Sequence, residues 1–444
     1  MTGKQVSTTE CYSRKRCEHS ALLRLIEFMG SLKAKIAQQI AQDKARQYAD
    51  AGVSRSSQLS ILIAAGCLTT MTGTIIAPIF PEMLQQMRLE PAWAATLAVS
   101  MHEIAIALFT PIMGLLADRI GKLNVLLPGL VFYSIFGVIG SLMPNLSMLL
   151  LDRALLGVAS ASIAAASIGL LGTLYHGDER TKILGYATSA MTTASIVTLL
   201  LGGWVGTIRW QFPFYLYALS LPVALLAFFF IKGGQSSSNP LITADQGKQL
   251  KSVVTAPDIL RLYLTIALAA TIMYTVIVYA PIYLNEVLGA NPGLRGTVLG
   301  IRAIGVVITS AFFASRLAKA MGTYRAIALG FLVMSVTLAT IPLLVQLHWI
   351  MVMAVGFGVG FGVVIPNTYD GLSKLAPPAV QATVLALGTG MNALGKFLCP
   401  VFLGPVREFM GLSYVFYVAA AIACLVAIVL WASPPPPSKK VVSG

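Results

Sequence analysis

The chain has 444 residues, of which 57% are hydrophobic and only 11% are charged, and its mean hydropathy is +0.79. Because a soluble domain carries about 25% charged residues, this composition excludes an ordinary water-soluble enzyme. The net charge of +14 would suggest nucleic acid as a partner for a soluble protein. For so apolar a chain we expect a lipid bilayer and no nucleic acid. The five cysteines form no CxxC pair, so we expect neither disulfides nor a metal site.

Twelve apolar stretches follow one another along the chain, each about as long as the 20 residues that a membrane-spanning helix needs. They cover 59–80, 93–115, 123–143, 147–171, 183–204, 211–231, 260–284, 296–318, 324–345, 348–370, 379–404 and 412–432. The sequence therefore predicts an all-α polytopic membrane protein with twelve transmembrane helices.

One long polar break separates the first six stretches from the last six. The expected parts are a cytoplasmic N-terminal tail (1–58), a six-helix bundle (59–231), a cytoplasmic linker (232–259), a second six-helix bundle (260–432) and a cytoplasmic tail (433–444). The N-terminal tail holds ten Lys/Arg and no apolar run long enough for a signal peptide. Its apolar and basic residues are spaced as in an amphipathic helix on an anionic membrane surface, and a flexible tail is the alternative.

The positive charges predict the orientation, because short loops rich in Lys/Arg stay in the cytoplasm. With the N-terminus inside, 24 of the 31 Lys/Arg fall in inside segments and four, Arg295 among them, in outside loops. The remaining three, Arg153, Arg302 and Lys396, lie within the spans. We therefore expect both termini to be cytoplasmic in a multi-pass protein of the plasma (inner) membrane.

A charged loop follows the second stretch and reads Gly114-Leu-Leu-Ala-Asp118-Arg119-Ile-Gly121-Lys122. A glycine at a helix end permits a turn, Gly114 lets a neighbouring helix approach closely, and the charges can form a conformational latch. A routine basic loop would explain Arg119 and Lys122 but not Asp118 or the glycines. At this place in a twelve-span chain, the pattern resembles the signature loop of the major facilitator superfamily. The resemblance implies alternating access, in which two six-helix bundles rock around a central cavity.

A weaker copy of this loop, Ser315-Arg-Leu-Ala-Lys319-Ala-Met-Gly322, follows the eighth stretch. With a shift of 201 residues, Gly322 corresponds to Gly121 and Lys319 to Asp118. Parallel internal repeats of this kind are found in the superfamily. We expect only the first copy to keep the charged latch.

The fourth stretch contains Asp152-Arg153-Ala-Leu-Leu-Gly157, which resembles the R-x-x-x-G motif of the superfamily's drug/proton antiporter branch. That resemblance implies a role for Arg153, with Asp152 beside it, in proton coupling. Arg153 and Gly157 share a helix face, so the guanidinium could lie over the glycine, or it could reach the membrane surface. The fifth stretch keeps the glycine pair of the branch's G-P-x-x-G-G motif but not the Gly-Pro, which leaves the direction of transport open.

Three further ionisable residues for proton coupling lie within the stretches, where charge is costly. Glu103 is about eleven residues into the second stretch, or about 16 Å deep, and is the first candidate for the proton carrier; a structural ion pair is the alternative. His102 is the neighbouring position, with its side chain about 100° away around the helix, and is an auxiliary group. Lys396 lies at a similar depth in the eleventh stretch. In the superfamily the second and eleventh helices pack against each other across the two halves, so the resemblance implies that Lys396 can pair with Glu103. Arg302, in the eighth stretch, is expected to reach the outer headgroups.

In the superfamily, helices 1, 4, 7 and 10 line the cavity. The resemblance therefore implies a substrate cavity formed by hydroxyl-bearing, aromatic and amide side chains: Thr70, Thr74, Ser160, Tyr274, Tyr279 and Asn367. Such a lining suits an amphipathic organic molecule, although Ser and Thr also serve helix packing.

Together these features predict a proton-coupled secondary transporter that exports a small amphipathic organic compound, as a monomer and without a cofactor. An importer or facilitator of a sugar, organic acid or similar solute is the first alternative. A membrane receptor or scaffold that has lost transport is the second. No HExxH, GxSxG or GxxxxGKS motif occurs, so we do not expect an enzyme.

Overall fold

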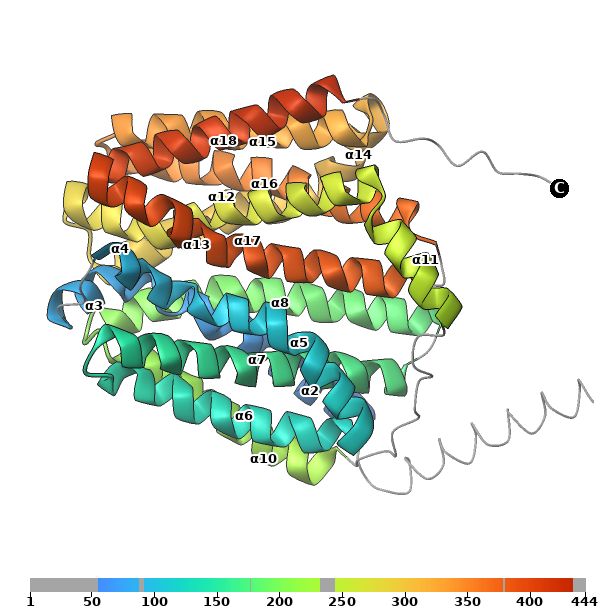
Figure 1. Cartoon of the computed structure of the whole chain (residues 1–444). Helices are drawn as coiled ribbons and strands as arrows, with labels where there is room; N and C mark the ends of the chain where they lie inside the picture. The colour runs from blue at the N-terminus through green and yellow to red at the C-terminus, as the bar shows by residue number, and fades with distance from the viewer. Residues whose placement is uncertain (1–54, 88–91, 176, 232–243, 378–379, 434–444) are drawn as a thin grey trace, which may run out of the picture. The chain divides into compact units, whose positions relative to one another are not determined.

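The computed structural model describes residues 55–87, 92–175, 177–231, 244–377 and 380–433. Every regular element among these residues is a helix, which confirms the all-α fold class. The expected amphipathic helix of the N-terminal tail and the C-terminal tail lie outside the described residues. From Ser60 onward the chain forms one compact unit, and Figure 1 shows its helices running side by side.

In the part of the chain that the structure describes, eleven helical segments are long and apolar enough to cross a membrane. They are Ser56–Gln86, Lys122–Leu142, Leu146–Gly172, Ile183–Gly206, Phe212–Phe230, Pro257–Leu288, Pro292–Met321, Thr323–Leu343, Leu347–Leu375, Thr383–Met410 and Leu412–Ala432. Each coincides with one of the twelve predicted stretches. The second predicted stretch is instead divided among α4 (Ala92–Ala95), the 3₁₀ turn η2 (Thr96–Val99) and α5 (Met101–Ile120).

The chain can be divided at the linker into an N-terminal half (60–231) and a C-terminal half (257–433). Besides α4 and α5, the N-terminal half contains α2 (Arg55–Thr74, whose first residues precede the half), α3 (Phe80–Gln86), α6 (Lys122–Ile139), α7 (Leu146–Leu174), α8 (Gly177–Gly206) and α10 (Ser220–Phe230). The C-terminal half contains α12 (Pro257–Leu288), α13 (Pro292–Ile308), α14 (Ala314–Met321), α15 (Thr323–Thr340), α16 (Leu347–Leu375), α17 (Gln381–Met410) and α18 (Leu412–Ala432). A further helix, α11 (Ala244–Val254), lies in the linker.

The two halves repeat the same local structure. The bounds of α6 and α15 differ by 201 residues at both ends, and so do those of α7 and α16. The predicted glycine turns lie at equivalent places, with φ +100° at Gly121 and +91° at Gly322. Only glycine adopts such angles readily, so these two residues end one helix and begin the next in each half.

The two halves meet along two helix pairs, α5 with α17 and α8 with α13. Helix α12 is the most enclosed of the candidate spans, because 83% of the residues in its apolar segment are buried. It packs on α16, α17 and α18 of its own half and on α3 of the other. These contacts place α12 and α17 next to the junction at which the candidate site lies.

Candidate functional site

An ion pair joins α5 to α17 across the two halves. Lys396 Nζ donates a hydrogen bond to Glu103 Oε1 over 2.9 Å. The Glu103 side chain is 9% exposed and that of Lys396 is 30% exposed, so the carboxylate is the more deeply buried partner. A buried charge needs a counter-ion or several hydrogen bonds. The carboxylate of one half thus depends on the amine of the other.

The local fold explains why a carboxylate is tolerated at this depth. The sequence predicted that Glu103 lies in the middle of a continuous helix. In the structure the second predicted span is broken at Ser100, so Glu103 lies in the first turn of α5. The unpaired N–H groups of a helix N-terminus carry partial positive charge, which favours a nearby carboxylate. Broken helices within the membrane are typical of transporter binding sites.

His102 flanks the same carboxylate. The ring is 1% exposed, and Nε2 lies 3.5 Å from Glu103 Oε1, although adjacent helix positions point in different directions. Its Nδ1 has no hydrogen-bond partner among the described residues. An imidazole ring, whose nitrogens can accept or donate a proton, therefore lies next to Glu103.

Gly73 of α2 provides the space for this arrangement, and the sequence reasoning missed it. A Cβ at position 73 would lie 2.7 Å from His102 Cε1 and 2.8 Å from Tyr274 Oη. Tyr274 of α12 donates its hydroxyl hydrogen to the Val99 carbonyl over 2.7 Å. The C-terminal half therefore contacts the break in the second span directly. No sequence pattern distinguishes Gly73 from the other glycines of the spans.

Gly157 of α7 supports the site from the other side. A Cβ there would collide with the backbone carbonyl of His102 and with Ala105 Cβ. The expectation that the Arg153 guanidinium lies over Gly157 is therefore wrong. A Cβ at Gly140, in contrast, would collide with that guanidinium.

Arg153 is 1% exposed, so it does not reach the membrane surface. Its Nε and Nη2 donate to Asp152 Oδ2 over 3.0 and 2.6 Å, and Nη2 donates to the Phe136 carbonyl over 3.2 Å. The guanidinium also lies 5.3 Å from the centroid of the Phe214 ring and 5.8 Å from that of Tyr217. These partners all belong to the N-terminal half, so the pair does not connect the two halves.

A second ion pair between the halves lies at the predicted outer end. Arg295 of α13 donates to Glu82 of α3, and the arginine side chain is 0% exposed. The charge count treated Arg295 as an outside-loop residue. The structure corrects this: Asn291 caps α13, accepting from the Leu294 N–H over 2.8 Å, so Arg295 lies within the first turn of a buried helix.

Glycines close the same end. A Cβ at Gly203 of α8 would lie 3.0 Å from the Gly296 Cα of α13, and one at Gly202 would collide with the Ile75 carbonyl. The glycine pair of the fifth-stretch motif thus permits backbone-to-backbone contact. Gly202 makes this contact within the N-terminal half, and Gly203 makes it with the C-terminal half.

The predicted inner ends of the same helices are open. A Cβ at Gly114 of α5, Gly185 of α8 or Gly390 of α17 would meet nothing within 4 Å. The close helix approach expected at Gly114 is therefore absent in this conformation. In this conformation the ion pairs and glycine contacts between the halves lie at the predicted outer end, and these three glycines at the inner end are uncovered; we call the two ends the closed end and the open end.

The remaining latch residues lie at this open end. Asp118 and Arg119 are exposed in the last turn of α5. Lys122 begins α6, and its side chain lies along α7, with Cε 3.1 Å from the Cβ position of Gly169.

The predicted cavity residues divide into two groups. Thr70 and Thr74 are partly exposed, and Thr74 bonds Thr198 over 2.8 Å. The others are buried: Ser160, Tyr274, Tyr279 and Asn367.

Ser160 bonds the Leu156 carbonyl and Thr72, and Asn367 Nδ2 donates to the carbonyls of Ala314 and Val363. Ala314 follows the π-helical turn η5 (Thr309–Phe313), so the amide stabilises a backbone irregularity. These two polar groups serve helix packing in this conformation.

Arg302 is 4% exposed and does not reach the headgroups, contrary to the expectation. Its Nη1 donates to Met273 Sδ over 2.9 Å. No carboxylate of the described residues forms an ion pair with it.

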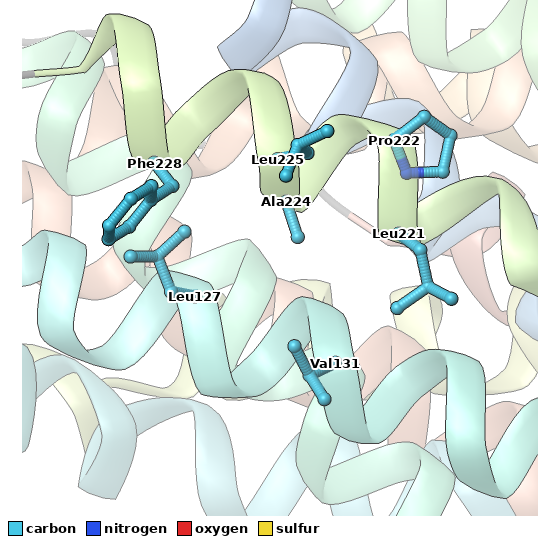
Figure 2. A pocket seen from close by; sticks show the side chains of 7 residues that line it. All are labelled: Leu127, Val131, Leu221, Pro222, Ala224, Leu225 and Phe228. Carbon is cyan, nitrogen blue, oxygen red and sulfur yellow. The ribbon is translucent and has the colours of Figure 1, made fainter.

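A groove of about 470 Å³ lies between α6 and α10, as Figure 2 shows, and its lining is entirely apolar: Leu127, Val131, Leu221, Pro222, Ala224, Leu225 and Phe228. No polar group there could orient a substrate. Among the described residues, no cluster of three His, Cys, Asp or Glu side chains could hold a metal ion.

Comparison with known proteins agrees with this architecture. The family model described as Major Facilitator Superfamily matches residues 62–400. The class B tetracycline resistance protein of Escherichia coli is 23% identical over 389 residues, covering 84% of this chain and 95% of that protein. The multidrug transporter protein MdtP of Bacillus subtilis (strain 168) is 26% identical over 181 residues, covering 40% of this chain and 32% of its own.

Solved transporters share the fold. The crystal structure of a bacterial homologue of the human lysosomal transporter Spinster superposes with a TM-score of 0.68 at 17% identity, covering 85% of this chain and 94% of that one. With a family model that matches most of its length, the chain belongs to the major facilitator superfamily of membrane transporters and is most like the drug/proton antiporter branch.

Proposed function

We propose that this protein is a proton-coupled exporter of a small amphipathic organic compound. Family membership makes it a multi-pass membrane transporter of small molecules. Its relatives include a tetracycline resistance protein and a multidrug transporter, which supports export of an organic compound. The observation that carries the proposal is the ion pair between Glu103 and Lys396, since it links proton binding to contact between the halves.

In the proposed cycle, the charged pair holds the predicted outer end closed. Protonation of Glu103 neutralises the carboxylate and weakens its attraction to Lys396, so a proton favours separation of α5 from α17 at that end. A substrate that enters from the open end and displaces the pair has the same effect. Each ligand then binds the two conformations with different affinity, which is the condition for driving a conformational change.

This arrangement gives antiport. Without a proton or a substrate the pair stays intact, and the empty transporter does not turn over. After the substrate has left on the outer side, water is proposed to hold the bare carboxylate in the open outer end, so that only neutral, protonated Glu103 can be buried again in the return step. The proton then leaves on the inner side, and Glu103 pairs with Lys396 again. His102, 3.5 Å from the same oxygen, is proposed to pass the proton to and from the carboxylate. Asp152 and Arg153 are proposed to adjust this coupling through α7.

The latch is proposed to act in the opposite conformation. When the predicted outer end opens, the inner ends of α5 and α17 approach, and Gly114 then allows close contact. Asp118, Arg119, Gly121 and Lys122 would hold that contact together. We propose that the protein acts as a monomer in the plasma (inner) membrane with both termini in the cytoplasm, since the asymmetry of the positive charges favours that orientation.

The test compares cells that express the chain with cells carrying an empty vector, using tetracycline and ethidium as the probe compounds. Expression should lower the accumulation of at least one probe, and a protonophore should abolish the difference. Unchanged accumulation of both would favour a receptor or scaffold. Lowered accumulation that survives the protonophore would overturn proton coupling.

A further inference from the structure

Among the basic side chains that pack inside the helix bundles, four have a carboxylate partner. Arg153 pairs with Asp152, Arg295 with Glu82, Lys396 with Glu103 and Arg407 with Glu286. Arg302 of α13 is the exception. Its Nη1 donates to the neutral sulfur of Met273, and its Nε has no hydrogen-bond partner among the described residues.

An isolated charge at this depth is costly, because neither the membrane interior nor the protein interior solvates an ion as well as water does. Arginine stays protonated under all ordinary conditions, so Arg302 cannot avoid the cost by losing its proton. A buried cation retained without a carboxylate is therefore suited to a negative group that arrives from outside the chain.

The surroundings of Arg302 connect it to the candidate site. From Thr271 to Leu284, every residue of α12 is buried except Met273, which keeps accessible surface. Met273 directly precedes Tyr274, whose hydroxyl contacts the break beside Glu103. Arg302 thus donates to the one partly accessible residue of this enclosed stretch, and a flexible methionine can move aside for a ligand.

We infer that Arg302 binds an anionic group, a carboxylate, on the transported compound. The guanidinium would bind the carboxylate oxygens in a bidentate manner, while the apolar part of the compound lies against α12. This inference deepens the proposed function, since it assigns the charge class of a compound transported from that same site. The preferred compound is then an amphipathic monoanion and not a cation.

The test uses purified full-length protein in lipid nanodiscs with matched probe pairs: benzoate, 2-naphthoate and 9-anthroate, each against its neutral amide. Wild-type protein should bind at least one carboxylate ten or more times more tightly than its amide. A tenfold preference equals about 1.4 kcal/mol. Arg302→Gln should lose that preference, and Arg302→Lys should keep part of it because the charge remains. Arg261→Gln removes an arginine that is paired with Asp258 and 33% exposed, and it should leave the preference intact.

Three results would overturn the assignment. The first is the absence of any carboxylate preference in the wild-type protein. The second is an unchanged preference in an Arg302→Gln variant whose unfolding temperature equals that of the wild type. The third is equal loss in Glu103→Gln, which would make Arg302 a counter-ion of Glu103 in the other conformation. The proposed function is tested separately, by protonophore-sensitive export of tetracycline and of the preferred carboxylate from cells: failure of both, together with a carboxylate preference in binding, would remove the exporter and leave the anion site.

Discussion

Gly203 and Gly296 face each other across the two halves, with the Cβ position of the first 3.0 Å from the Cα of the second. A Cβ at Gly296 would in turn lie 2.6 Å from the Leu199 carbonyl. No side chain fits between α8 and α13 at this point. The predicted outer end can therefore close fully only while both positions are glycine.

Gly296→Val should prevent this closure and shift the population toward an open outer end. The shift can be measured as faster labelling of a cysteine introduced at Thr207, with a membrane-impermeant maleimide. Gly390→Val is the matched control, because a Cβ at position 390 meets nothing within 4 Å. Equal labelling rates in Gly296→Val and wild type would show that the glycine contact does not control the outer end.

The pair between Arg295 and Glu82 should contribute to stability. Glu82→Gln leaves a fully buried guanidinium without its counter-ion, and loss of one partner of a buried pair costs about 3 kcal/mol. We expect a lower unfolding temperature in detergent, and partial recovery in the double variant Glu82→Gln with Arg295→Met. Similar unfolding temperatures for Glu82→Gln and wild type would argue that solvent already screens the pair.

The sequence predicted the part of the fold that periodicity and composition encode. Eleven of the twelve stretches coincide with long apolar helices, and two of the four positive-φ glycines of the described residues, Gly121 and Gly322, lie in the two loop copies. The pairing of Glu103 with Lys396 followed from their depth and from the superfamily's helix arrangement. The break at Ser100 was missed because α4, η2 and α5 together read as one apolar run.

Other features depend on contacts that no local pattern encodes. Arg295 looks like a loop residue because it follows Asn291, Pro292 and Gly293, yet those residues cap a buried helix. Arg302 was expected to reach the surface from its distance to the helix end, but its side chain is held beside α12. In each case the direction of a side chain, set by packing, decided the outcome.

Asp118→Asn should slow transport while leaving substrate binding nearly unchanged. Asp118 is exposed at the open end of α5, away from Glu103, so its charge is proposed to act on closure of that end and not on substrate binding. Transport rate and equilibrium binding should be measured on the same preparation with the probe exported by the wild type. Asp370→Asn, which removes an exposed carboxylate paired with Lys374, is the control; normal turnover in Asp118→Asn would exclude a latch role.

The orientation can be tested by cysteine labelling in intact cells, after the five native cysteines are replaced. A membrane-impermeant reagent should label a cysteine at Asn145 or Asn291, which are exposed residues that cap α7 and α13. It should not reach one at position 237, in the predicted cytoplasmic linker. Labelling of position 237 without permeabilisation would reverse the orientation.

The proton-carrier role of Glu103 can be separated from a structural one by removing the pair in two steps. Glu103→Gln imitates the protonated carboxylate, so substrate should bind while a proton gradient no longer drives export. This variant also leaves the Lys396 amine without its counter-ion, which should lower the unfolding temperature. Adding Lys396→Met removes that charge as well, and stability should recover.

The two roles differ in what the double variant does with the gradient. If the pair only joins α5 to α17, gradient-driven export should return together with stability, because apolar replacement of a buried pair is often tolerated. If Glu103 carries the proton, stability returns and export stays lost. The double variant Glu286→Gln with Arg407→Met is the control, since it removes a pair 3.4 Å apart whose carboxylate is 50% exposed. It should export normally. Full gradient-driven export by Glu103→Gln alone would exclude the carrier role and direct attention to Asp152 and Arg153.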